Sequence, residues 1–127
     1  MMKELVLEKT VKTPYVNCDP KSGVIKINGR SIPENPEEFY DQIFVWLKEY
    51  FTQPLPETNV HVQLEYINSG SSKFILELFY IVQDFHKKGA ISKISWYYEE
   101  DDEAIFSLGE HYRNTVKIPF NLIERFN

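Results

Sequence analysis

The sequence predicts an α/β fold: a single domain over residues 1–127, with a mixed β-sheet, helices packed on it, and an N-terminal third rich in β-hairpin. Apolar residues recur at helical spacing in several stretches, and short runs of strand-like residues lie between them. The chain has 127 residues, of which 43% are hydrophobic, enough for one real core. Strands that alternate with helices in the second half predict right-handed crossovers and a partly parallel sheet.

The N-terminal third is predicted to contain strands and no helix. Runs rich in apolar and β-branched residues predict strands over residues 4–12, 15–19 and 24–28. Residues 20–23 include a proline and a glycine in the composition of a tight turn, so the second and third strands are expected to form a hairpin. Gly29 is expected to turn the chain away from that hairpin.

A connector over residues 30–36 leads into the first predicted helix. Asn35 is a good helix cap, Pro36 suits the first helical position, and two acidic residues follow in the first turn. Helical spacing then places on one face Phe39, Ile43, Trp46, Leu47 and Tyr50. The helix is expected to end near Thr52, because prolines at positions 54 and 56 prevent its continuation.

The second half is predicted to alternate strands with helices. Residues 60–67 alternate as a strand with one buried face, and residues 74–85 form a wide helical stripe that ends in two lysines and a glycine. Strand character returns over residues 91–98. A short helix over residues 104–112, weakened by Gly109, and a last strand over residues 116–122 follow. Pro119 interrupts that strand and favours an edge position or a bulge.

The turn between the strand at 60–67 and the helix at 74–85 is crowded with polar side chains. Asn68 is followed by Ser69, Gly70, Ser71 and Ser72. A helix start leaves about four N–H groups without helical partners, and serine and asparagine are the side chains that best satisfy them. The same N–H groups and the helix dipole favour an added phosphate. The turn is therefore interpreted as a helix cap or as a phosphorylation switch, with Gly70 leaving the backbone open to a partner.

Composition argues against several classes of partner. With 14 basic and 19 acidic residues the net charge is -5, which disfavours a nucleic-acid partner. No apolar run approaches the roughly 20 residues of a membrane span, and the first residues do not resemble a signal peptide, so a cytoplasmic location is expected. Cys18 is the single cysteine and is interpreted as a small core residue.

No motif for a metal, a cofactor or catalysis stands out. The three histidines, at positions 61, 86 and 111, share no metal-ligand spacing, and phosphate-loop and nucleophile-elbow motifs are absent from the sequence. The expectation is a protein without metal or cofactor that is not an enzyme. A rival hypothesis is a small ligand-binding module or enzyme that uses the acidic run Glu99–Glu103 and an aromatic groove around Trp96. A structural subunit of a larger assembly is a third possibility.

Several stretches together resemble one protein family. They are Thr13-Pro14, Asp19 with Gly23, Gly29-Arg30-Ser31, Pro33-Glu34-Asn35, Phe39-Tyr40, Trp46-Leu47, residues 66–73, Trp96-Tyr97-Tyr98 and Pro119-Phe120. On these residues the chain resembles the SiaC-like biofilm-regulation phosphoproteins of bacteria. More broadly it resembles the STAS-like anti-sigma-factor antagonists, in which a strand, an Asn/Asp-Ser/Thr turn and an apolar helix follow one another.

This resemblance implies a STAS-like fold and a non-enzymatic switch. In such proteins a partner kinase phosphorylates the hydroxyl that follows the asparagine, a PP2C-type phosphatase removes the phosphate, and the unmodified form binds and activates a diguanylate cyclase. By position the acceptor is Ser69, ahead of Ser71 and Ser72. The family pattern has Thr then Ser where this chain has Ser69 and Gly70, and serine is a competent acceptor.

The resemblance also suggests supporting residues. Around the acceptor, Asn68, Gly70 and Lys73 are expected to support the switch loop. The residues suggested for partner binding are Arg30, Glu34, Asn35 and Tyr97. For Arg30, an ion pair with Glu34 or with a buried carboxylate is the structural alternative.

Overall fold

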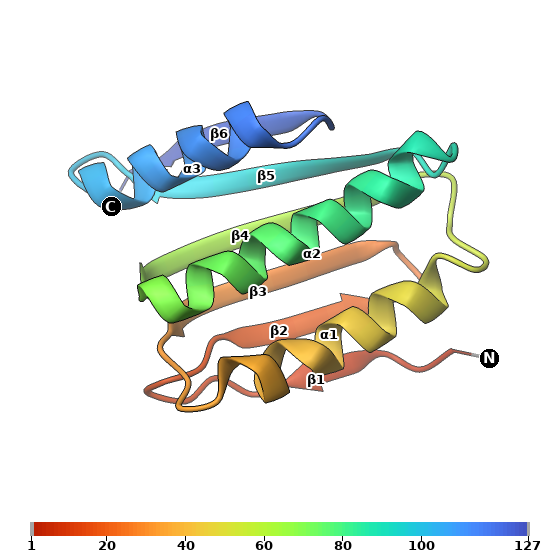
Figure 1. Ribbon diagram of the computed structural model, residues 1–127, viewed down its shortest axis with the longest axis horizontal. Coiled ribbons are helices and arrows are strands. Elements are labelled where there is room, and N and C mark those ends of the chain that lie inside the picture. The colour runs from red at the N-terminus through yellow and green to blue at the C-terminus, as the bar shows by residue number, and fades with distance from the viewer. Residues whose placement is uncertain (1, 127) are drawn as a thin grey trace.

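The computed structural model describes residues 2–126 as one six-stranded sheet with three helices (Figure 1). The strands are β1 (Leu5–Leu7), β2 (Tyr15–Asp19), β3 (Val24–Ser31), β4 (Thr58–Ile67), β5 (Ser92–Glu99) and β6 (Phe120–Arg125). The helices are α1 (Pro36–Tyr50), α2 (Ser69–Lys87) and α3 (Glu103–Thr115). The strands lie in the sheet in their order along the chain. The predicted mixed α/β fold is confirmed, with an antiparallel N-terminal part (β1 to β3) and a parallel remainder.

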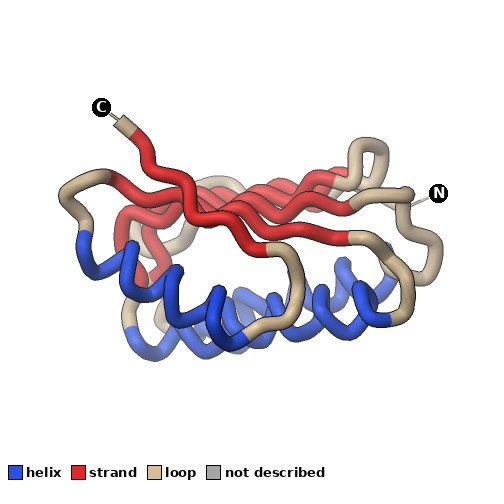
Figure 2. The backbone as a smooth tube through the Cα atoms, turned by 90° about the horizontal axis from the view of Figure 1, so that it is seen from above, coloured by secondary structure: helices blue, strands red, loops and turns tan. Residues whose placement is uncertain are grey.

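All three helices cover the same face of the sheet (Figure 2). The alternation along β4 shows this: Val60, Val62 and Leu64 are buried, whereas His61 and Gln63 between them are only partly covered. Side chains that point away from the helices therefore form a second face, which we call the open face. The core lies between the sheet and the helices.

Aromatic side chains join the helices to each other and to the sheet. Between α1 and α2, Tyr40 stacks on Phe74 with ring centres 5.9 Å apart, and Phe51 stacks on Phe85 at 4.7 Å. Under α3, the fully buried Trp96 of β5 meets Tyr112 edge to face at 5.3 Å. Pairs of this kind add specific geometry to apolar burial, so the relative position of the three helices is well defined.

Helix α1 begins where its capping residue predicted. The Asn35 side chain accepts a hydrogen bond from the N–H of Glu38 at 3.2 Å, and Pro36 is the first residue of α1, as predicted. The α2 stripe is confirmed, with Ile75, Leu78, Phe79 and Val82 buried. Gly89 follows the end of α2 with a φ of 107°, the left-handed conformation that glycine adopts most easily.

Two predicted strands have different bounds. The strand expected over residues 4–12 is only β1, because the Thr10 hydroxyl accepts hydrogen bonds from the N–H groups of Lys12 and Thr13 and closes a turn there. The last strand starts at Phe120 rather than at residue 116, directly after Pro119, which has no N–H to give to a ladder. The predicted edge position of this strand is confirmed.

Gly29 and Gly109 have structural roles that differ from those expected from the sequence. Gly29 does not turn the chain away: it lies inside β3 with a φ of 121°, where the register with β4 shifts between Gly29 and Arg30. The chain absorbs this residue as a bulge and continues as a strand. Gly109 lies in the middle of a longer helix than predicted, α3. A Cβ there would come within 2.4 Å of the Trp96 indole, so the position requires glycine.

Candidate phosphorylation switch at the start of helix α2

The polar turn lies between the end of β4 and the start of α2. The N–H of Asn68 donates to the main-chain oxygen of Ser31 on the neighbouring strand β3, at 3.2 Å. The Asn68 side chain accepts from the N–H of Ser71 at 3.0 Å. Asn68 is therefore the cap and Ser69 is the first residue of the helix, so the turn caps α2 through its asparagine and not through a serine.

The three serines of the turn differ in exposure. Ser69 is exposed, whereas the side chain of Ser71 has a relative exposure of 0% and points to the core. Ser72 is half-buried, and its hydroxyl donates to the main-chain oxygen of Ser69 at 3.0 Å. A Cβ added to Gly70 would meet only the Asn68 side chain, at 3.8 Å, so the space beside Ser69 is open. Among the three hydroxyls, that of Ser69 is the accessible one.

The local electrostatics favour a negative group at Ser69. Within residues 2–126, the N–H groups of Ser69 and Gly70 donate no hydrogen bond to a protein acceptor. No acidic residue occupies the first turn of α2, and Lys73 lies one turn further on, exposed, with its ammonium group over the Phe74 ring. Free N–H groups, the helix dipole and a cation at i+4 all stabilise an anion at this position.

Hydrogen bonds from two buried tyrosines, Tyr112 and Tyr40, hold the turn and the neighbouring end of β3 in place. The Tyr112 hydroxyl on α3 donates to the main-chain oxygen of Ser72 at 2.7 Å, and the Tyr40 hydroxyl on α1 is hydrogen-bonded to Ser31. Burial raises the pKa of Tyr40 to about 12 and also raises the pKa of Tyr112, so both stay protonated at neutral pH. The switch turn is thus bonded to α3 through Tyr112 and to β3 through Ser31, which in turn is bonded to α1 through Tyr40. Sequence reasoning missed these tyrosines, because Tyr112 contacts a residue 40 positions away.

The residues suggested for partner binding are spread over the molecule. The Arg30 guanidinium lies 5.5 Å from the centre of the Tyr66 ring, two residues before Asn68. The predicted pairing of Arg30 with Glu34 is wrong, since Glu34 pairs with Lys12 at 2.8 Å, and this hydrogen bond lowers the pKa of Glu34. Arg30 is therefore near the switch turn, while Asn35 has its structural role as the cap of α1.

Tyr97 belongs to β5 and lies on the open face, where its hydroxyl is hydrogen-bonded to Nδ1 of His61 at 2.9 Å. Its suggested role in partner binding stays a prediction.

Trp96 cannot line the aromatic groove that the rival hypothesis places around it. Trp96 has a relative exposure of 0%, and its indole N–H donates to the main-chain oxygen of Ile105 inside the core. The Asp102 side chain caps α3 by accepting from the N–H of Ile105 at 3.0 Å, as expected for acids at a helix start.

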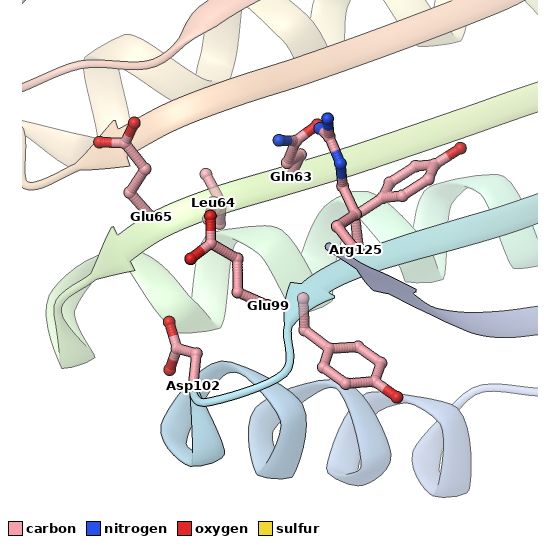
Figure 3. Close-up of a pocket in the computed structure, with 8 residues that line it drawn as sticks. Gln63, Leu64, Glu65, Glu99, Asp102 and Arg125 are labelled. Atoms are coloured by element: carbon pink, nitrogen blue, oxygen red, sulfur yellow. The ribbon is translucent and has the colours of Figure 1, made fainter. Parts of the chain in front are cut away.

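Beside the acidic run is a small hollow of about 110 Å³ (Figure 3). The carboxylates of Glu65, Glu99 and Asp102 gather on one side of it, with Gln63 and Arg125 on the other. Ligand pockets usually measure about 300–1,000 Å³, so this hollow is too small for the expected substrate or ligand. The acidic run is explained by capping and solvent exposure.

The other reactive side chains are separated or buried. Within residues 2–126 no group of three His, Cys, Asp or Glu side chains is placed to hold a metal ion. Cys18 is in the core, as predicted, and burial raises the pKa of its thiol to about 12. None of the helices in the described part of the chain is long and apolar enough to span a membrane.

We compared the chain with protein families and with known proteins. The model of the SiaC family of regulatory phosphoproteins matches residues 7–125. The uncharacterized protein PA14_02130 of Pseudomonas aeruginosa (strain UCBPP-PA14) is 25% identical over 119 residues, which are 94% of each chain.

Two solved structures show how similar the fold is. The apo-SiaC crystal structure from Pseudomonas aeruginosa superimposes with a TM-score of 0.88 at 24% identity, over 96% of this chain and 99% of that one. A chain in the crystal structure of diguanylate cyclase SiaD in complex with its activator SiaC, from the same organism, gives a TM-score of 0.90 at 24% identity, over 95% and 99%.

The fold and the site define a one-sided α/β domain with an accessible hydroxyl at a strand-to-helix turn. With a family match across nearly its whole length, the chain belongs to the SiaC family of regulatory phosphoproteins. The resemblance to that family is confirmed. The wider likeness to STAS-like antagonists stays a prediction.

Proposed function

We propose that this protein is a non-enzymatic signalling switch that a partner kinase phosphorylates on Ser69. The observation that carries the proposal is the exposure of Ser69 at the first position of α2. Of its neighbours, Ser71 is buried, and the Ser72 hydroxyl is already hydrogen-bonded to the main chain. A PP2C-type phosphatase reverses the modification, and the cycle runs in the cytoplasm, where the ATP that a kinase needs is available.

The unmodified form binds and activates a diguanylate cyclase, so its output feeds cyclic di-GMP signalling and biofilm regulation. Support for this partner comes from the similar chain that is named as the activator in a complex with diguanylate cyclase SiaD. Membership of a regulatory phosphoprotein family supports the phosphorylation step.

The physical basis of the switch is a local change of charge. A phosphate adds about 1.5 to 2 negative charges at neutral pH. At Ser69 it is stabilised by the free N–H groups of the first turn and by Lys73, so the helix stays folded. The same charge changes the surface that a partner meets, and this protein already carries a net charge of -5. Phosphorylation therefore acts on docking and leaves the fold intact.

Arg30 is the second residue we assign to this surface. It lies over Tyr66, which is 49% exposed, and both residues are close in sequence or register to the switch turn. A guanidinium in this part of the surface can bind a carboxylate of the partner.

The first test identifies the modified residue. The protein is incubated with its kinase and ATP and then mapped by peptide mass spectrometry. We expect the phosphate on Ser69, and a phosphate on another residue with Ser69 unmodified would refute the assignment.

The second test measures the output. Binding to the cyclase is compared for wild type, Ser69→Ala and Ser69→Asp, with Ser107→Asp on the exposed side of α3 as the control for added charge. Ser69→Ala should bind as wild type does, and Ser69→Asp should bind more weakly than Ser107→Asp. Equal binding of the cyclase by the two Ser69 variants would refute the proposal that charge at Ser69 controls binding.

A further inference from the structure

The open face of the sheet carries a hollow that the switch does not use. It measures about 470 Å³ and is lined by Lys26, Asn28, His61, Gln63, Tyr97 and Arg125, which we call the cationic hollow. These residues come from β3 to β6, and the sheet register sets Lys26 beside His61 and Gln63 beside Tyr97. The hollow is shallow and open to solvent, so it offers a small ligand a surface site on the sheet and not an enclosed pocket.

The two cations of the hollow have no carboxylate partners. Among residues 2–126, neither Lys26 nor Arg125 takes part in an ion pair, whereas the nearby Lys93 is held by Glu57 at 3.1 Å. Two unpaired cations that line one concave site are notable in a protein with a net charge of -5. Such an arrangement creates a local positive potential and favours an anionic ligand.

Neutral donors add to the two cations. The side-chain amides of Asn28 and Gln63 make no hydrogen bond within the described part of the chain, so their N–H groups are available. None of the residues that line the cationic hollow is acidic. Glu65, Glu99 and Asp102 line the adjoining smaller hollow, which shares Gln63, Tyr97 and Arg125 with this one, and Glu65 is paired with Lys9 at 3.7 Å.

His61 is held in one orientation at the centre of the hollow. Its Nδ1 is 2.9 Å from the Tyr97 hydroxyl, and the two rings stack with centres 5.8 Å apart. Burial, then Lys26 and Lys93, lower the pKa of His61, so the imidazole is neutral at neutral pH. Either His61 Nδ1 or the Tyr97 hydroxyl can donate in this hydrogen bond. In the tautomer in which the hydroxyl donates, the ring proton is on Nε2 and provides one more donor for a ligand.

We propose that the cationic hollow binds the phosphate group of a small ligand. Lys26 and Arg125 neutralise its charge, and His61, Asn28 and Gln63 donate hydrogen bonds to its oxygens. Guanidinium and phosphate form strong charge-assisted hydrogen bonds, and a dianion matches two unpaired cations better than a single carboxylate does. The site lies on the face of the sheet opposite to the helices and is independent of the proposed role of Ser69.

The experiment is a titration of the ¹⁵N-labelled full chain with inorganic phosphate, followed by NMR at constant ionic strength. We expect saturable shifts at His61, Gln63 and Tyr97. The pKa of His61 should rise when phosphate is bound, because a nearby anion favours the imidazolium. Lys26→Gln and Arg125→Gln should each weaken binding by about tenfold. Lys48→Gln, at an exposed position of α1, is the matched control and should bind as wild type does.

The same spectra show whether each variant is folded. Shifts that grow linearly without saturation, or that sodium chloride reproduces, would overturn the proposal. So would saturable shifts confined to Ser69 and Gly70 at the start of α2. AMP and ribose 5-phosphate then identify the source of the phosphate: tighter binding of AMP assigns a nucleotide whose base contacts the His61 and Tyr97 rings, and equal binding assigns the phosphate group alone.

Discussion

The phenol hydroxyl of Tyr112 donates a hydrogen bond of 2.7 Å to the main-chain oxygen of Ser72 and so joins α3 to the first turn of α2. Tyr112 is buried, and its ring packs edge to face on Phe79 of α2 and on Trp96 of β5. The proposed acceptor, Ser69, lies in the same turn, with its main-chain oxygen bonded to the Ser72 hydroxyl. A structural change in that turn therefore alters a direct contact with α3.

Tyr112→Phe should loosen the switch turn without disturbing the core. The ring packing is kept and one buried hydrogen bond is lost, so we expect a loss of about 1 kcal/mol in the free energy of unfolding. Hydrogen exchange at the amides of Ser71 and Ser72, which are hydrogen-bonded to Asn68, should accelerate by a factor of about 5 for that loss. Urea denaturation and exchange measurements check both values. Tyr80→Phe, at an exposed position of α2, is the control, and an equal effect of the two variants would contradict the assigned role.

Asn68→Ala should destabilise α2 through the loss of its cap. Replacing an asparagine cap by alanine costs typically about 1 kcal/mol, because the N–H of Ser71 loses its side-chain acceptor. Asn68→Asp keeps an acceptor and adds a favourable charge at the helix start, so it should be as stable as wild type. Thermal and urea unfolding of the two variants distinguish the cap from other roles of the residue. A loss of the same size in both would show that capping is not its main contribution.

The helix starts could be predicted because their chemistry is local. Asn35, Asn68 and Asp102 each accept a hydrogen bond from an N–H three residues further on, and the residue types alone indicate such positions. The short β1 could not be foreseen in the same way, since the Thr10 turn competes with a strand pattern of similar strength.

The choice of Ser69 among the serines comes from the family resemblance, although the helical pattern of the sequence also supports it. Ser71 precedes the buried residues Ile75 and Leu78 by four and seven positions, which places it on the buried stripe of α2. Ser69 falls outside that stripe, and its exposure follows. The hydrogen bond from Tyr112 and the cationic hollow, by contrast, join residues from separate elements and depend on the strand order and the sheet register.

Gly109→Ala should destabilise the protein although alanine is the better helix former. Helix propensity alone predicts a gain of about 1 kcal/mol. The added Cβ would come within 2.4 Å of the Trp96 indole and 2.9 Å of Leu122, and a buried indole cannot move aside easily. Overpacking of a core costs typically about 1–3 kcal/mol, sometimes more, so we expect a net loss of about 2 kcal/mol. Urea denaturation followed by tryptophan fluorescence measures it.

The control for this substitution is Ser107→Ala, at an exposed position of the same helix. It should leave stability unchanged or raise it by about 0.5 kcal/mol or less, from helix propensity alone. A stabilised Gly109→Ala would show that the close approach of α3 to Trp96 is not required.

His61 should make stability depend on pH in a defined window. Its pKa in the folded protein is lowered from the ordinary value of 6.5 by burial and by the positive charges of Lys26 and Lys93. Below about pH 6.5 the unfolded chain therefore binds more protons at this residue than the folded one, and stability falls as the pH is lowered through that range. His61→Gln should flatten the curve between about pH 5 and 7, where carboxylates contribute little. In Lys26→Gln the pKa of His61, followed by NMR, should rise toward its ordinary value, because one repelling charge is gone. Lys48→Gln is the control, and an unchanged pKa of His61 in Lys26→Gln would show that this lysine does not act on the imidazole.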